Sequence, residues 1–199
     1  MKPRTARTAA TDDAPASQWV LTPDIRLSGE VCDDTLRSLL DQLDGLPSDC
    51  MAAAVEISTN GGDAEVARRM VLEIGLARQR FPATRFVFIG KTNVYSAGVT
   101  LMAAFPRDDR YLCRDAVLLI HCRQLDKTIE LSGPMRSSLP KVRSVAAQIE
   151  LGMKIEEANF RQLIEGSDVA LDQLLRKAEH NWYVPAKEAH KLKLVRGLF

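Results

Sequence analysis

Apolar residues follow two different spacings along this chain, and together they predict strands that alternate with helices. Short continuous apolar runs are typical of buried strands, whereas apolar residues at every third or fourth position are typical of amphipathic helices. The runs predict strand-like pieces at 19–21, 25–29, 53–58, 86–89 and 117–120. The wider spacing predicts helices near 36–43, 66–77, 97–105, 141–165 and 169–178, with a last short helix that opens at Pro185. This alternation favours an α/β fold built from parallel βαβ units with right-handed crossovers.

The polar stretches between these elements predict where helices and strands stop. Asp33 or Asp34 can cap the first helix. Residues 90–96 predict a polar turn, and residues 122–134 predict an irregular segment. The first 17 residues combine Thr, Ala, Pro and Asp without apolar periodicity, so we expect a flexible N-terminal arm over 1–17 and one domain over 18–199.

Composition narrows the class of protein. The chain has 199 residues, 46% hydrophobic and 27% charged, with a formal net charge of +1. These values argue against a disordered chain and against a nucleic-acid-binding protein. The four cysteines lack the spacing of a zinc site or a disulfide framework, so we expect no metal, no cofactor and a reducing cytoplasm. The apolar stretches are too short for a membrane span, and no signal peptide is evident.

One candidate for chemistry is a Gly-Gly turn at the end of a predicted strand, where α/β folds tend to place their sites. Its sequence is Ser58-Thr59-Asn60-Gly61-Gly62-Asp63. The glycines let the backbone come close to a ligand and aim its N–H groups at it, although a plain tight turn explains them equally well. Neither dinucleotide nor P-loop glycine spacing is present, so the turn is not a phosphate-binding loop of those types.

A serine and a histidine lie after two further predicted strands, the serine at the end of the polar turn over 90–96 and the histidine directly after 117–120. Ser96 lies among small residues at a strand-to-helix junction, where the N–H of Ala97 is a free donor at the helix start. A lone serine at this place is usually a helix cap, and a lone histidine such as His121 is more often a core residue than a base. In combination, a serine, a histidine and backbone donors are what an activated nucleophile and its oxyanion hole require.

These motifs and their order resemble the Clp protease proteolytic subunits, within the wider Clp protease and crotonase superfamily. The resemblance covers residues 18–197 and rests on three strand-end motifs and a closing segment. They are Ile57-Ser58-Thr59-Asn60-Gly61-Gly62, Tyr95-Ser96-Ala97-Gly98, Leu119-Ile120-His121, and Asn181 to Ala189 followed by Leu194-Val195. Ser96 and His121 stand 25 positions apart, the usual separation in the family. The resemblance implies an α/β fold of stacked ββα repeats with a long helical handle.

The resemblance also implies roles for individual residues. Ser96 would be the nucleophile and His121 the general base, while Gly62 and Ala97 would supply the N–H groups of the oxyanion hole. The implied activity is that of a serine-type endopeptidase that cleaves unfolded polypeptides through an acyl-enzyme. The implied partners are further copies of the chain in a homo-oligomeric ring, with the long helix packed against a facing ring, and an ATP-dependent unfoldase.

The third member of the implied triad departs from the family. Counting back from Glu188-Ala189 places Asn181 at the family's acidic position, whereas counting forward from Gly166 places Glu179 there. The backward count rests on matched residues closer to the site, so we favour Asn181, with Glu179 as the alternative and Asp172 as a substitute if the backbone shifts. An asparagine carbonyl can accept the imidazole N–H but brings no charge.

Three other interpretations stay open. Asn181 is compatible with a catalytically weakened or inactive ring subunit. A crotonase-like enzyme for acyl-CoA would use a similar pair of backbone donors but has no required role for Ser96 and His121. Cys122 stands beside His121, but neighbouring strand residues point to opposite faces, which favours a buried structural thiol over a nucleophile.

The segment after His121 lacks the family's glycines, so the family's peptide preference and ring contacts do not carry over directly to this chain.

Overall fold

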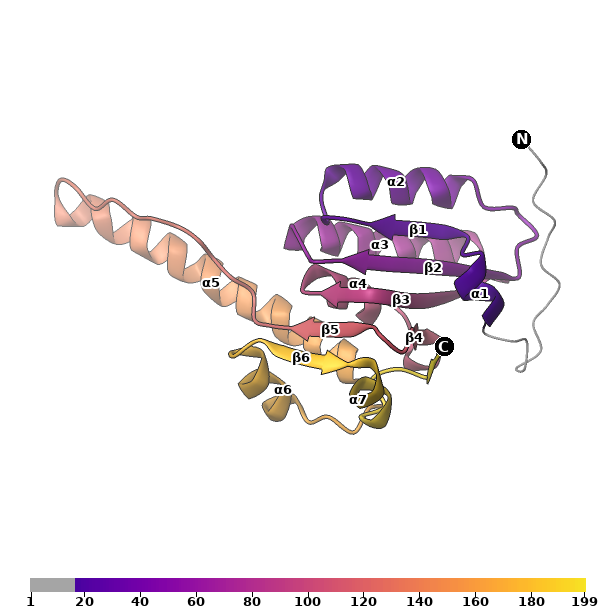
Figure 1. Ribbon diagram of the computed structural model, residues 1–199. Helices are drawn as coiled ribbons and strands as arrows, with labels where there is room; N and C mark the ends of the chain where they lie inside the picture. The colour runs from indigo at the N-terminus through magenta and orange to yellow at the C-terminus, as the bar shows by residue number, and fades with distance from the viewer. Residues whose placement is uncertain (1–16) are drawn as a thin grey trace.

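The computed structural model describes residues 17–199, which form a mainly parallel sheet with helices packed on it and one long helix that projects away (Figure 1). The arm expected over 1–17 lies outside the described residues except for Ser17, which begins a helix. The strands are β1 (Ile25–Ser28), β2 (Ala52–Thr59), β3 (Arg85–Tyr95), β4 (Arg110–Leu112), β5 (Val117–Ile120), β6 (Trp182–Pro185) and β7 (Gly197–Leu198). The α-helices are α1 (Ser17–Leu21), α2 (Asp33–Asp44), α3 (Ala64–Arg80), α4 (Ala97–Ala103), α5 (Met135–Ile164), α6 (Leu171–Ala178) and α7 (Ala186–Lys191), and Arg107–Asp109 is a short 3-10 helix.

The sheet divides at β3, and this division positions the strand ends that matter for function. β1, β2 and β3 run parallel in that order. The first half of β3 pairs with β4, and its second half, Asn93–Tyr95, pairs in parallel with β5. β5 then pairs with β6 in the sheet's one antiparallel ladder among the described strands. The carboxyl ends of β2, β3 and β5 therefore lie at the same edge.

Two apolar clusters cover opposite faces of the sheet. The larger lies under α3 and α4 and takes Ala53, Val55 and Ile57 from β2. The smaller takes the alternating residues Ala52 and Ala54, together with Trp19 of α1. Because the central strands are buried on both faces, they show continuous apolar runs rather than alternation, which is why β2 was predictable.

Several predicted boundaries are wrong, for physical reasons. The piece at 19–21 is helical rather than extended. Residues 90–95, expected as a polar turn, continue β3, because Asn93–Tyr95 find partners on β5. Cys32 rather than either aspartate is the N-cap of α2, where Thr35 completes a capping box. The long helix begins at Met135, six residues earlier than expected, although Pro140 removes one backbone donor within it.

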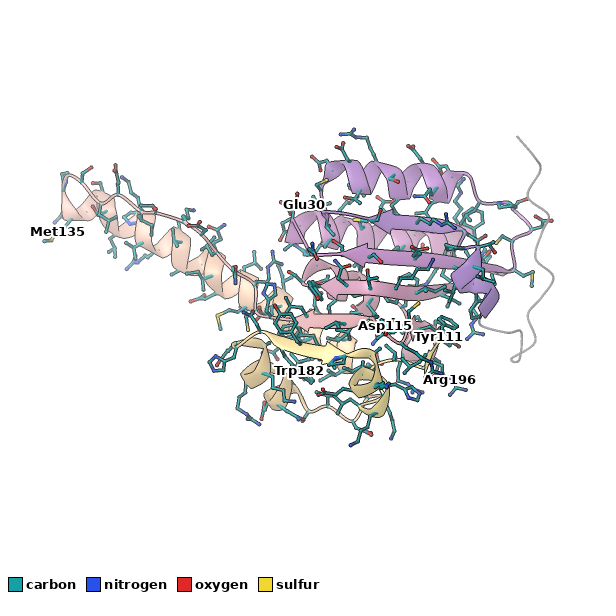
Figure 2. The ribbon with its side chains drawn as sticks, viewed as in Figure 1. Glu30, Tyr111, Asp115, Met135, Trp182 and Arg196 are labelled. Carbon is teal, nitrogen blue, oxygen red and sulfur yellow. The ribbon has the colours of Figure 1, made fainter. Side chains whose placement is uncertain are left out.

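The long helix α5 leaves the body of the molecule with the irregular segment 121–134 beside it (Figure 1). Figure 2 shows Met135 at the far tip, where its side chain is 90% exposed. Further large apolar side chains on this projection are also exposed: Leu125, Ile129, Leu131, Leu139, Val142, Ile149, Leu151 and Met153. Exposed apolar surface of this extent is typical of a protein-protein contact. Within residues 17–199, none of the helices, α5 included, is both long and apolar enough to span a membrane.

A buried arginine fixes the foot of α5 to the body. Arg110 of β4 is only 2% exposed, and its guanidinium donates to carbonyl oxygens of three separate elements. They are Ala103 and Phe105 at the end of α4, Gln162 and Leu163 at the end of α5, and Leu194 before β7, at distances of 2.6 to 3.4 Å. These carbonyls include helix ends that lack intrahelical partners, so Arg110 serves as a shared C-terminal cap. Burial lowers its pKa to about 10, which leaves it charged at neutral pH.

Candidate active site

A pocket of about 360 Å³ opens at the edge where β2, β3 and β5 end, between α4 and the foot of α5. It brings together four residues that the sequence assigned to catalysis: Gly62, Ser96, Ala97 and His121. They come from three separate strand ends, so the fold rather than local sequence creates their proximity.

Ser96 adopts a backbone conformation that is uncommon for any residue other than glycine. It is the N-cap of α4 with φ 53° and ψ −112°. The surroundings hold it there, because its N–H donates to the Leu119 carbonyl of β5 at 2.9 Å and its own carbonyl accepts from Val99 at 2.9 Å. Strain of this kind costs about 1–3 kcal/mol and tends to concentrate at functional sites. The side chain makes no capping hydrogen bond, so the reading of Ser96 as a simple helix cap is not supported.

Two backbone donors flank Ser96. Ala97 is the first residue of α4, so its N–H has no partner within the helix. The Gly-Gly turn is fixed by hydrogen bonds from Val31 N–H to Gly61 and from Asp63 N–H to Val31, both 2.8 Å, which leave the Gly62 N–H without an acceptor among the described residues. Gly62 has φ 145°, and a Cβ there would lie 2.3 Å from the Val31 carbonyl oxygen. Only glycine therefore fits this turn.

His121 follows the last residue of β5 and faces the same pocket. Its Nδ1 lies 2.7 Å from the carbonyl oxygen of Cys122. A carbonyl only accepts, so Nδ1 must carry the proton, and Nε2 keeps the lone pair that a general base needs. Ser96 and His121 are not hydrogen-bonded to each other in this structure, a common looseness in a site without substrate.

Asn181 stands next to His121 across the β5–β6 ladder, but the two side chains are not hydrogen-bonded to each other. The β5–β6 ladder ends at the pair Ile120 and Trp182, so His121 and Asn181 are the next residues along the two strands. Tyr183 packs edge-on against Tyr95, with ring centroids 5.9 Å apart, which fixes this segment next to Ser96. Asn181 itself is exposed, has φ 58°, and makes no side-chain hydrogen bond to the described residues.

Glu179 is also absent from the pocket. It is exposed at the C-terminal end of α6, and its carboxylate makes no hydrogen bond to His121. The structure therefore brings the predicted nucleophile, base and donors together and does not assign a third side chain. The Cys122 carbonyl takes the place of the group that would orient the imidazole.

Cys122 does not have the character of a nucleophile. Burial, together with the nearby carboxylates of Glu156 and Glu179, raises the pKa of its thiol to about 11. At neutral pH the thiol stays protonated, and the thiolate is the reactive form.

The different pKa shifts of the Cys32 and Cys122 thiols predict which of the two reacts faster with an alkylating reagent. The Cys32 sulfur and the Thr35 hydroxyl oxygen lie 3.5 Å apart, and hydrogen bonding with the side chain and backbone of Thr35 lowers the pKa of the Cys32 thiol. At pH 8 a thiol with a pKa near 11 is thiolate in only about one molecule in a thousand. We expect iodoacetamide to alkylate Cys32 at least about tenfold faster than Cys122, as followed by peptide mass spectrometry over time. Faster modification of Cys122 would contradict the assignment and would restore it as a candidate nucleophile.

The residues that form the far wall of the pocket were not predicted from the sequence. Glu156, Asn159, Phe160 and Leu163 contribute from α5, and Arg123 contributes from the segment after β5. Arg123 joins these elements, because its N–H donates to the Glu156 carboxylate and its guanidinium pairs with Glu65 of α3 at 2.6 Å. This ion pair lowers the pKa of Glu65. Only the closeness of Arg123 to His121 in sequence could have signalled any of these residues.

Known proteins share both this fold and, at a lower level, the sequence. The ATP-dependent Clp protease proteolytic subunit 2 of Treponema pallidum (strain Nichols) is 26% identical over 187 residues, which cover 91% of this chain and 84% of the relative. An asparagine-to-aspartate mutant of ClpP1 from Listeria monocytogenes has the same fold, with a TM-score of 0.68, 16% identity and coverage of 92% of this chain and 94% of that one. No protein-family model matches the sequence.

The molecule has a ClpP/crotonase-like fold, which confirms the fold predicted from the motifs. At the level of sequence the chain is similar to a Clp protease proteolytic subunit over 91% of its length, as its motifs indicated.

Proposed function

We propose that this chain is a serine endopeptidase that cleaves unfolded polypeptides through an acyl-enzyme. The observation that carries the proposal is Ser96: a strained residue at a helix start, whose hydroxyl caps nothing and lines a pocket shared with His121 and two backbone donors. A strained strand-to-helix turn that presents a serine is a recurrent form of nucleophile. The similarity to a subunit of an ATP-dependent protease supports the same reaction class.

The chemistry follows from the positions of these groups. His121 Nε2 removes the proton of Ser96 as Oγ attacks the peptide carbonyl carbon, and the Gly62 and Ala97 N–H groups stabilise the negative oxygen that forms. The C–N bond then breaks, and the imidazolium gives its proton to the leaving amine. Water, deprotonated by the same imidazole, attacks the ester, which releases the acid and restores Ser96.

The peptidase proposal is tested with an unstructured polypeptide and the purified chain, with products identified by mass spectrometry. Internal cleavage that disappears in Ser96→Ala supports a serine endopeptidase. Cleavage that persists in Ser96→Ala would assign the activity to another residue or to a contaminant.

We further propose that the chain works as a homo-oligomeric ring in the cytoplasm, to which an ATP-dependent unfoldase delivers unfolded polypeptides. The exposed apolar surface of α5 and of the segment beside it supports contact with other copies. Four free cysteines among the described residues are compatible with a reducing compartment.

A catalytically inactive ring subunit is the second candidate, and Asn181 favours it. In the Ser-His-Asp template, replacing Asp by Asn lowers the rate about 10⁴-fold because the imidazole takes the wrong tautomer. Here the Cys122 carbonyl already fixes the productive tautomer through Nδ1. What the site lacks is a carboxylate hydrogen-bonded to the imidazole, which would stabilise the imidazolium, so we expect a weakened rather than an inactive enzyme.

Asn181→Asp is therefore expected to raise peptidase kcat/KM about tenfold, because a carboxylate next to His121 stabilises the imidazolium by about 1.4 kcal/mol. The measurement is hydrolysis of a fluorogenic peptide by the wild-type and variant chains. Glu179→Gln is the matched control and should leave the rate unchanged, since Asn181 rather than Glu179 is the residue next to His121 across the β5–β6 ladder. A lower or unchanged rate in Asn181→Asp would show that another acid already serves His121.

A further inference from the structure

The pocket next to Ser96 has one wall of mixed character that the catalytic scheme does not use. Val99, Ala103, Phe160 and Leu163 make it largely apolar. Glu156 of α5 is the one carboxylate that lines the pocket in the part of the chain that the structure describes. A partly buried carboxylate beside apolar residues is unusual unless it is paired or has a ligand to bind.

The partners of Glu156 are both neutral. One carboxylate oxygen accepts from the Arg123 N–H, and the carboxylate also lies against the Cys122 thiol. Over residues 17–199, no lysine, arginine or histidine forms an ion pair with it. The carboxylate is thus fixed in position by donors that leave its charge uncompensated.

In the part of the chain that the structure describes, Arg123 supplies the guanidinium that lines the pocket, and this guanidinium has an ion-pair partner. It pairs with Glu65 of α3, a carboxylate outside the pocket that also pairs with Arg68. Among the carboxylate and guanidinium groups that line the pocket, the one without an ion-pair partner is therefore the carboxylate of Glu156. A basic side chain with an apolar stem fits this wall, because its methylene groups can contact the apolar residues while its head reaches the carboxylate.

We propose that Glu156 makes the pocket select lysine or arginine at the residue whose carbonyl carbon Ser96 attacks. This inference rests on the proposed peptidase function for its biological meaning, since it specifies the substrates of that site. Glu156 acts here by binding the substrate side chain and takes no part in proton transfer.

The test measures binding in a Ser96→Ala background, so that it does not depend on turnover. Two fluorescent peptides are compared by anisotropy, identical except for lysine or its uncharged counterpart norleucine at the central position. We expect the lysine peptide to bind about tenfold more tightly. Adding Glu156→Gln should bring the two affinities to within about twofold, because the amide keeps the shape and the bond from Arg123 but removes the charge.

Glu157→Gln is the matched control, because Glu157 is the next residue on α5, is exposed, and pairs with Arg161 instead of lining the pocket. It should retain the lysine preference. Glu156→Lys provides a second variant and should favour a glutamate peptide over the lysine peptide. Equal affinities, tighter binding of a glutamate peptide to Ser96→Ala alone, no binding of either peptide, or a lysine preference that survives Glu156→Gln would each overturn the proposal.

The same peptides with Ser96 intact separate this proposal from the function it specifies. If the lysine preference in binding depends on Glu156 but neither peptide is cleaved, the peptidase proposal fails and the inference about binding stands. If both peptides are cleaved at a ratio that Glu156→Gln does not change, the inference fails and the peptidase proposal stands.

Discussion

Ser96→Ala and His121→Ala are each expected to abolish peptide hydrolysis, by about 10⁴-fold or more and to nearly the same extent. The two groups act as one unit, because the hydroxyl is a poor nucleophile without the imidazole and the imidazole has nothing to activate without the hydroxyl. Fluorogenic peptide turnover by the wild-type and variant chains measures both effects.

Matched controls for these variants lie outside the pocket. Ser28 is an exposed serine at the end of β1, and His190 is an exposed histidine on α7. Ser28→Ala and His190→Ala should retain full turnover. If His121→Ala keeps most of the turnover, the proposed base is wrong.

Arg110→Met is expected to lower the free energy of unfolding by about 4 kcal/mol, the largest effect on stability that the structure predicts. The methionine fills a similar volume but leaves the carbonyl groups at the ends of α4 and α5 without donors, and each buried unsatisfied group costs about 1–3 kcal/mol. Replacing both partners of a buried ion pair by apolar residues can leave stability unchanged. Here only the arginine is replaced, and the buried backbone carbonyls that it served remain without donors. Guanidinium chloride denaturation measures the change.

Arg107→Met is the control for Arg110→Met. Arg107 precedes β4 by a few residues and pairs with the exposed Asp108, so its loss should change the free energy of unfolding by less than about 1 kcal/mol. A similarly small change in Arg110→Met would show that water or rearranged backbone satisfies the carbonyls, and that Arg110 does not hold α5 in place.

The sequence predicts those helices and strands whose apolar residues are buried at regular intervals. The central strand β2 and the helix α3 were found because the core covers their apolar positions regularly. The strands β4, β6 and β7 were not expected. Two or three residues are too few to show a period in β4 and β7, and Pro185 at the end of β6 was interpreted as the start of a helix. The end of β3 was missed because its polar residues are held by pairing with β5, which is a tertiary effect.

The candidate site likewise contains some residues that could be predicted from the sequence and others that could not. Ser96 and His121 could be found because each follows a predictable strand and stands within a recognisable motif. Glu156 could not, because it lies 35 residues after His121 on a helix whose rotation and angle the tertiary fold sets. The role of the Cys122 carbonyl was also beyond reach, since every residue has a carbonyl and only the structure shows which one meets Nδ1.

Reaction of the purified chain with a serine-reactive fluorophosphonate tests the central claim most directly. We predict one adduct, located on Ser96 by mass spectrometry, absent from Ser96→Ala and strongly reduced in His121→Ala. A folded and assembled sample without an adduct at Ser96 would contradict an activated nucleophile, and the non-catalytic ring subunit would then be the better account.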